Sequence, residues 1–172
     1  MSKDRTPARG ITGAGSPEPA RPGRGTVVGL VLRVLAAAAL AVDAIVHARM
    51  APGYQSAAPE GFGEGNLFLA EAVAAAAAGL YVLIRGSSPA WLLALLTAGG
   101  GLAVLLLYRY IDVPAFGPFP AMYEPVWFVE KTLTAFAQGA AVLLVAIALI
   151  LDRRSRPKTA SGTSAPTGRD TP

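Results

Sequence analysis

The sequence predicts an all-α protein, a transmembrane antiparallel four-helix bundle with disordered cytoplasmic tails. Three observations lead to this fold. Hydrophobic residues make up 53% of the 172-residue chain and charged residues only 15%, which is more apolar material than a soluble domain of this size buries. Four apolar runs approach the roughly 20 residues that a helix needs to cross a bilayer. Basic residues gather in both tails, beside the first and last runs.

The first two predicted spans cover residues of about 26–48 and 67–85, and both are rich in alanine. Asp43 interrupts the first span and Glu71 the second. A cleaved signal peptide is an alternative for the first run. Its length exceeds that of the apolar region of a signal peptide, and Asp43 and His47 stand where a cleavage site requires small residues. We therefore expect the first run to remain as a membrane span.

The third and fourth predicted spans cover residues of about 89–109 and 129–151, and they are the most continuous apolar runs of the chain. Aromatic residues stand at their ends, where the membrane interface favours amphipathic rings; these are Trp91, Tyr108, Tyr110, Trp127 and Phe128. The four spans together form one predicted domain, residues 26–151.

Both tails are basic and lack apolar periodicity. Residues 1–25 and 152–172 are rich in Pro, Gly, Ser, Thr and Arg, a composition that does not offset the entropy of ordering. The positive-inside rule then places both termini in the cytoplasm, which agrees with an even number of spans. The basic residues behind the net charge of +4 lie in these tails, beside the predicted spans. We therefore expect them to contact the lipid bilayer and not a nucleic acid.

The loop between the third and fourth spans has an unusual composition. Pro114, Pro118, Pro120 and Pro125 prevent a continuous helix, while Phe, Met, Tyr and Trp residues make the loop too apolar for a freely solvated linker. We expect it to lie on the outer membrane interface, either as an anchor or as a lid over the bundle. The first loop is a shorter connection rich in Pro and Gly.

Seven polar or ionisable residues stand at matching ends of the four spans. In an antiparallel arrangement they gather near the outer membrane face, where each apolar helix contributes at least one of them. Because a charge within hydrocarbon is costly, such a cluster is either paired for packing or used for a function. The candidates are Asp43, His47, Glu71, Arg109, Asp112, Glu130 and Lys131.

Three interpretations of this cluster differ in the partners of the carboxylates. A structural network pairs Asp43, Glu71 and Glu130 with Arg109, Lys131 and protonated His47. A proton- or ion-handling site instead uses the carboxylates and the imidazole as exchangeable groups. A metal site is the third interpretation, in which Asp43, His47, Glu71 and Glu130 supply one nitrogen and three oxygens, compatible with manganese, iron or zinc. The single His and the two nearby cations oppose this third interpretation, and the sequence predicts no metal.

Several function classes are not supported by the residues present. The chain has no cysteine, which excludes thiol catalysis and thiolate metal ligation. No Ser stands in a plausible triad with His47, so the sequence predicts no catalytic residue and no cofactor. We expect a structural or accessory membrane protein. Its expected partner is a second copy of the chain, in a homo-oligomer, or another membrane protein. The alternatives are a small proton- or ion-coupled transport element and a redox-associated subunit.

Three segments carry a resemblance to known proteins. HARMAPGYQ follows the first span, EGNLF precedes the second, and YRYIDVPAFGPFPAMYEPVWFVEKTL joins the third and fourth. This order resembles small four-helix integral membrane proteins of high-GC bacteria, a group without an established activity. The abundance of Arg, Ala, Gly and Pro is typical of such genomes. The outline is also similar to that of DoxX-like four-helix proteins, which implies an association with quinone-linked redox systems and a location in a bacterial plasma membrane.

Overall fold

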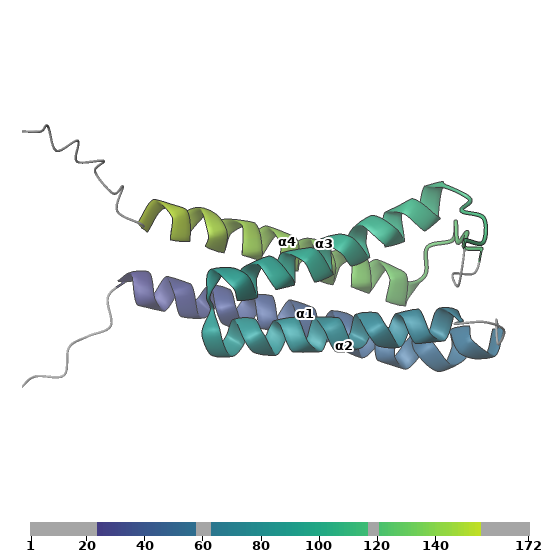
Figure 1. Ribbon diagram of the computed structural model, residues 1–172, viewed down its shortest axis with the longest axis horizontal. Coiled ribbons are helices and arrows are strands. Elements are labelled where there is room, and N and C mark those ends of the chain that lie inside the picture. The colour runs from purple at the N-terminus through teal and green to yellow at the C-terminus, as the bar shows by residue number, and fades with distance from the viewer. Residues whose placement is uncertain (1–23, 58–62, 117–120, 156–172) are drawn as a thin grey trace, which may run out of the picture.

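The computed structural model describes residues 24–57, 63–116 and 121–155 (Figure 1). The prediction of an all-α fold with four long helices is confirmed for these residues. The helices are α1 (Arg24–Ala57), α2 (Glu64–Arg85), α3 (Ser88–Tyr110) and α4 (Val129–Ser155). An isolated antiparallel bridge pairs Val113 with Met122 in the loop before α4. The predicted disordered tails fall almost entirely outside the described residues.

The connection between α2 and α3 is a tight reversal of the chain. Gly86 ends α2 with φ 52°, and its N–H donates to the Val82 carbonyl at 2.9 Å; a left-handed conformation of this kind favours glycine. Pro89 stands in the first turn of α3, where a missing N–H has no cost. Trp91 Nε1 donates to the Gly86 carbonyl at 3.0 Å. The turn residues therefore fix where both helices begin and end.

Helix α1 continues past residue 48, where the first span was predicted to end, as far as Ala57. It contains Pro52, which removes one backbone hydrogen bond and ordinarily kinks or ends a helix. Packing against α2 favours the longer helix, because Ala51 and Gln55 lie against Gly65 and the Tyr54 ring stacks on Phe68 at 4.3 Å between centroids. At 34 residues, α1 is about 50 Å long, which exceeds the ~30 Å of a hydrocarbon core.

The four helices pack in a ring, with α1 against α2 and α4, and α3 against α2 and α4. The α1–α2 contact is the most extensive, and small residues make it possible. A Cβ placed on Gly79 would lie 3.3 Å from Leu40 Cβ, so the helix backbones approach closely at this point. Alanine fills most of the core, which also includes Leu40, Val82, Trp91 and Val145. Close contact through small residues is what helix association in lipid requires.

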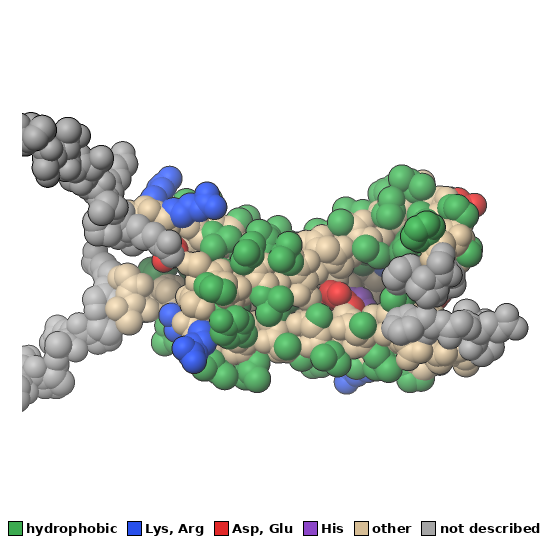
Figure 2. Space-filling view, viewed as in Figure 1, with side chains coloured by type: hydrophobic (Ala, Val, Ile, Leu, Met, Phe, Trp, Pro, Cys, Tyr) green, Lys and Arg blue, Asp and Glu red, His purple; other side chains and the backbone are tan. Residues whose placement is uncertain are grey.

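Most large apolar side chains point outward. Each of the four helices is long and apolar enough to cross a membrane, and only 17–33% of the residues in each apolar window are buried within the protein. Figure 2 shows the resulting hydrophobic surface along the helices, with basic side chains gathered near the end where α1 begins and α4 ends. Such a surface is compatible with a multi-pass membrane protein, because lipid tails cover it at no cost.

The close approach at Gly79 leads to a first prediction. Gly79→Leu forces a branched side chain into the α1–α2 contact, and overpacking of this kind costs about 1–3 kcal/mol. We expect a lower Tm and a smaller monodisperse fraction in size-exclusion chromatography after heating in detergent. Ala76→Leu, an exposed position on the same helix, is the matched control and keeps the Tm of the parent. Equal Tm values for the two variants would show that α1 and α2 do not approach at Gly79.

Candidate functional site

Asp43 lies near the middle of the apolar length of the bundle. Arg33 on the same helix packs against Gly86, at the end where α2 and α3 join. Asp43 follows Arg33 by ten residues, which is about 15 Å along a helix axis and half of a ~30 Å hydrocarbon core. Its side chain is completely buried. Asp43 therefore lies well inside the apolar length of α1.

His47 is the nearest polar neighbour of Asp43. Its Nδ1 lies 3.1 Å from Asp43 Oδ1 and 3.0 Å from the Asp43 backbone carbonyl oxygen. The carbonyl accepts the hydrogen bond when Nδ1 carries a proton, so Oδ1 is within ion-pair distance but in poor alignment for a hydrogen bond. Neither carboxylate oxygen of Asp43 has a hydrogen-bond partner among the described residues. The other side of the His47 ring contacts Phe68, with 5.2 Å between centroids.

Glu71 and Gln138 complete a group that we call the polar hub: Asp43, His47, Glu71 and Gln138. Glu71 lines the same pocket as His47. Gly101 of α3 leaves the space that Glu71 and Gln138 fill, since a Cβ at this glycine would overlap Gln138 Nε2 and lie 2.7 Å from Glu71 Oε1. The side chains of the hub therefore come from α1, α2 and α4, and a glycine of α3 leaves the space that they occupy.

The hub has many hydrogen-bond acceptors and few donors. Four buried oxygen atoms of the hub have no hydrogen-bond partner among the described residues. They are Asp43 Oδ1, Asp43 Oδ2, Glu71 Oε1 and Gln138 Oε1. An unsatisfied buried polar group costs about 1–3 kcal/mol, and more when it is charged. The arrangement is suited to a ligand that brings donors or positive charge.

A second polar group, which we call the loop anchor, consists of Tyr54, Glu124 and Lys131. Tyr54 Oη donates to Glu124 Oε1 at 2.6 Å, and Lys131 Nζ donates to the Glu124 carbonyl and lies 3.4 Å from Oε2. The Glu124 N–H donates to the Tyr108 carbonyl at 3.0 Å. One residue of the Pro-rich loop is thereby attached to α1, α3 and α4, and Lys131 is already engaged there.

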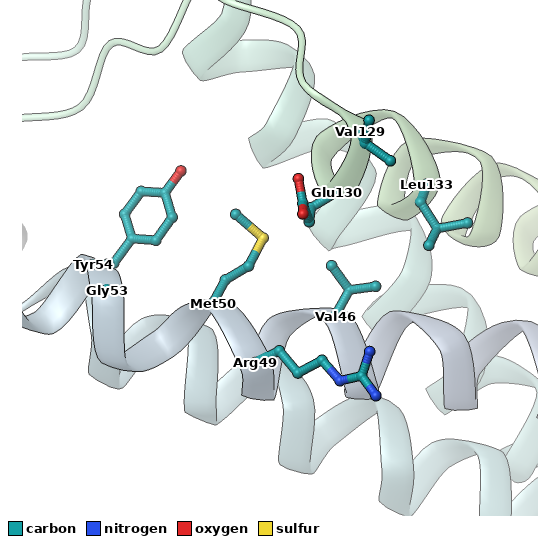
Figure 3. Close-up of a pocket in the computed structure, with 8 residues that line it drawn as sticks. All are labelled: Val46, Arg49, Met50, Gly53, Tyr54, Val129, Glu130 and Leu133. Carbon is teal, nitrogen blue, oxygen red and sulfur yellow. The ribbon is translucent and has the colours of Figure 1, made fainter.

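The other charged candidates from the sequence lie apart from the hub. The Arg109 guanidinium is 5.0 Å from the Tyr110 ring centroid and 6.0 Å from that of Trp127, and its buried Nε has no acceptor within the described ranges. Asp112 and Glu130 are exposed. Figure 3 shows the Glu130 carboxylate in a groove between α1 and α4, together with Met50 and Tyr54 of α1. Lys131, and not Glu130, continues the buried face of α4.

The described residues include no ligand group that supports the metal interpretation. In the part of the chain that the structure describes, His, Asp and Glu side chains form no set of three or more that could hold an ion. Of the four residues considered as ligands, Asp43, His47 and Glu71 belong to the hub, while Glu130 lines the groove between α1 and α4.

A pocket of about 600 Å³ separates α2 from α3 beside the hub. Figure 2 shows acidic and histidine side chains exposed together in an opening on this face of the bundle. The hub contributes His47 and Glu71 to the lining, and the loop anchor contributes all three of its members. The remaining lining residues are mainly apolar and come mostly from α2, α3 and the loop, with Met50 of α1 and Thr134 of α4. The pocket therefore joins the two polar groups.

Two members of the loop anchor were not identified as candidates from the sequence. Tyr54 follows His47 by two helical turns, so it shares the hub face only if α1 continues through Pro52. Glu124 is an acidic residue in an otherwise apolar loop, which is a signal for a specific partner. Thr134 and Gln138 of α4 are also buried, at 4% and 1% exposure.

Three consecutive glycines of α3 provide a test of the hub. Gly101→Ala places a Cβ against Glu71 and Gln138 and displaces them, which we expect to lower the Tm in detergent by the equivalent of about 1–3 kcal/mol. A Cβ at Gly100 meets nothing within 4 Å, and one at Gly99 has ordinary contact with Val142 at 3.8 Å. Gly100→Ala and Gly99→Ala should therefore leave the Tm unchanged or raise it. A uniform response of the three variants would contradict the position of Gly101 in the hub.

Comparisons of the chain with known proteins leave its family open. No family model, no curated protein and no solved structure matches it.

Proposed function

We propose that this chain is an accessory multi-pass protein of a bacterial plasma membrane that binds a positively charged ligand in its polar hub. The excess of buried acceptor oxygens in the hub carries this proposal. In hydrocarbon, no water is present to donate to these oxygens, so their cost persists until a ligand satisfies them. Intramembrane carboxylates of this kind mark binding sites or ion pathways more often than they serve packing.

The positions of the cations favour a binding site over a structural ion-pair network. Such a network requires Arg109 and Lys131 beside Asp43 and Glu71. The ion pairs of the hub and the loop anchor are those of His47 with Asp43 and of Lys131 with Glu124, while Arg109 lies over aromatic rings. His47 is consequently the only cationic side chain that forms an ion pair with a hub carboxylate in this part of the chain.

The proposed membrane arrangement is an antiparallel bundle with both termini in the cytoplasm. Its support is the concentration of Arg and Lys in the tails and beside the ends of α2 and α4, together with the positive-inside rule. This orientation directs the loop anchor and the pocket toward the outer face of the membrane. The tails are proposed to remain disordered on the basis of their composition.

A small proton- or ion-coupled transport element is the second candidate, because a hub that lacks donors suits an exchangeable cation equally well. It requires access to the hub from both sides of the membrane, which an oligomer or a partner protein would provide. The redox-associated alternative rests on the DoxX-like outline of the sequence, and the geometry of the hub adds no support to it.

The direction in which Glu71→Gln shifts the Tm tests the proposed function. Glu71→Gln removes a negative charge and adds an amide donor, so it relieves the shortage of hydrogen-bond donors in the hub. We expect the Tm of the ligand-free protein in detergent to rise, by the equivalent of about 1–3 kcal/mol. In a structural ion-pair network the same substitution removes an attractive partner and lowers the Tm. Thermal unfolding followed by size-exclusion chromatography measures the difference.

Glu130→Gln is the matched control for this experiment. It makes the same chemical change on an exposed carboxylate outside the hub, where we expect no change in Tm. A fall in Tm for Glu71→Gln with an unchanged control would overturn the proposed cation site and support the structural network.

A further inference from the structure

The mouth of the pocket between α2 and α3 opens at the depth of the membrane. Its rim includes Leu96 and Val104, which are 65% and 47% exposed on the apolar surface. They follow Ser88 by 8 and 16 residues, or about 12 and 24 Å along the axis of α3. The mouth thus spans the middle of a ~30 Å hydrocarbon core. A molecule that enters through it comes from the bilayer and has an apolar part.

The interior of the pocket has an excess of negative charge. Glu64, Glu71 and Glu124 line it against a single lysine, Lys131. That lysine is held by Glu124, and His47 is held by Asp43. Glu71 therefore faces the pocket with a buried oxygen that has no donor in the described part of the chain. Charge complementarity indicates a cationic head group that donates hydrogen bonds.

Apolar residues surround this carboxylate and continue toward the loop. Leu67 and Phe68 of α2 line the pocket, Leu105 and Tyr108 of α3 also contribute to its lining, and Phe128 belongs to the segment that leads into α4. The volume of about 600 Å³ is typical of sites for small organic ligands and much larger than a bare monovalent ion needs. The lining accommodates an aliphatic chain beside the charged head.

We infer that the pocket binds an amphiphilic amine, a primary ammonium group on an aliphatic chain, taken laterally from the bilayer between α2 and α3. This inference rests on the proposed function and specifies the class of the cation. The ammonium group donates to Glu71 at the edge of the hub, and the chain lies against the apolar lining. Because lipid tails are as apolar as the pocket, selectivity comes from the head group.

Equilibrium binding of radiolabelled dodecylamine to the full-length protein in phosphatidylcholine nanodiscs tests this inference. Empty nanodiscs correct for partition into lipid, and dodecanol serves as a neutral competitor of the same chain length. Hydrogen bonds to a charged group contribute about 1.5–3 kcal/mol, which corresponds to roughly 10- to 150-fold in affinity. We expect saturable amine binding at one site and at least about tenfold weaker competition by dodecanol.

Two variants locate the amine in the pocket. Gly100→Phe places a ring at the mouth, where a Cβ meets nothing within 4 Å, and should abolish saturable binding without loss of folded protein. Gly139→Phe is the matched control on α4, since its Cβ also meets nothing within 4 Å and the residue does not line the pocket. Glu71→Gln should reduce the preference for the amine over dodecanol at least about tenfold.

Each result supports or overturns the inference. Equal affinity for dodecylamine and dodecanol overturns it, as does amine binding that Gly100→Phe leaves unchanged. If sodium or potassium chloride raises the Tm and dodecylamine shows no preference, a metal cation occupies the hub; the amine inference then fails, while a higher Tm of Glu71→Gln still supports the proposed function. A lower Tm of Glu71→Gln removes both.

Discussion

The absence of water from a bilayer is the constraint on which the arrangement of this protein depends. In hydrocarbon every backbone and side-chain polar group must find its partner within the protein. The four helices satisfy their own backbone groups, and the outward apolar side chains require nothing further. The buried carboxylate of Asp43 and the half-buried carboxylate of Glu71 are the charged exceptions within the hub. Their unsatisfied oxygens distinguish the middle of the protein from a purely apolar helix bundle.

Small residues determine where these polar groups meet. Gly79 and the alanines bring α1 and α2 together closely, and Gly101 leaves the volume that Glu71 and Gln138 occupy. Larger residues at these positions would fill the hub with aliphatic carbon. The same small side chains limit the apolar area that the helices bury against each other, so packing alone stabilises the protein modestly. A ligand or lipid in the pocket between α2 and α3 adds the contacts that the helices themselves do not make.

The loop before α4 links the pocket to the rest of the protein. Glu124 accepts hydrogen bonds from α1 and α4 and donates its N–H to α3, although it belongs to none of these helices. It also binds Lys131 by a hydrogen bond and an ion pair. The loop therefore both lines the pocket and engages a lysine of its lining.

The sequence by itself determined the helical class and the four apolar segments, since run length and composition are local properties of the chain. It also identified Asp43, His47 and Glu71 as the residues that need an explanation, because an ionisable group in an apolar run is visible without any tertiary contact. Thr134 and Gln138 are four residues apart, so helical periodicity alone puts them on one face of α4.

Tertiary structure alone decided which of the charged residues meet. Glu130 and Lys131 are neighbours on α4, yet Glu130 is exposed and Lys131 is buried. The sequence of one amphipathic helix does not define the rotation of that helix about its axis to within a single residue. The continuation of α1 through Pro52 depends on packing against Gly65 and Phe68, which are distant in the chain. The pocket depends on the relative positions of α2, α3 and the loop, and so does the shortage of donors that gives the hub its chemical character.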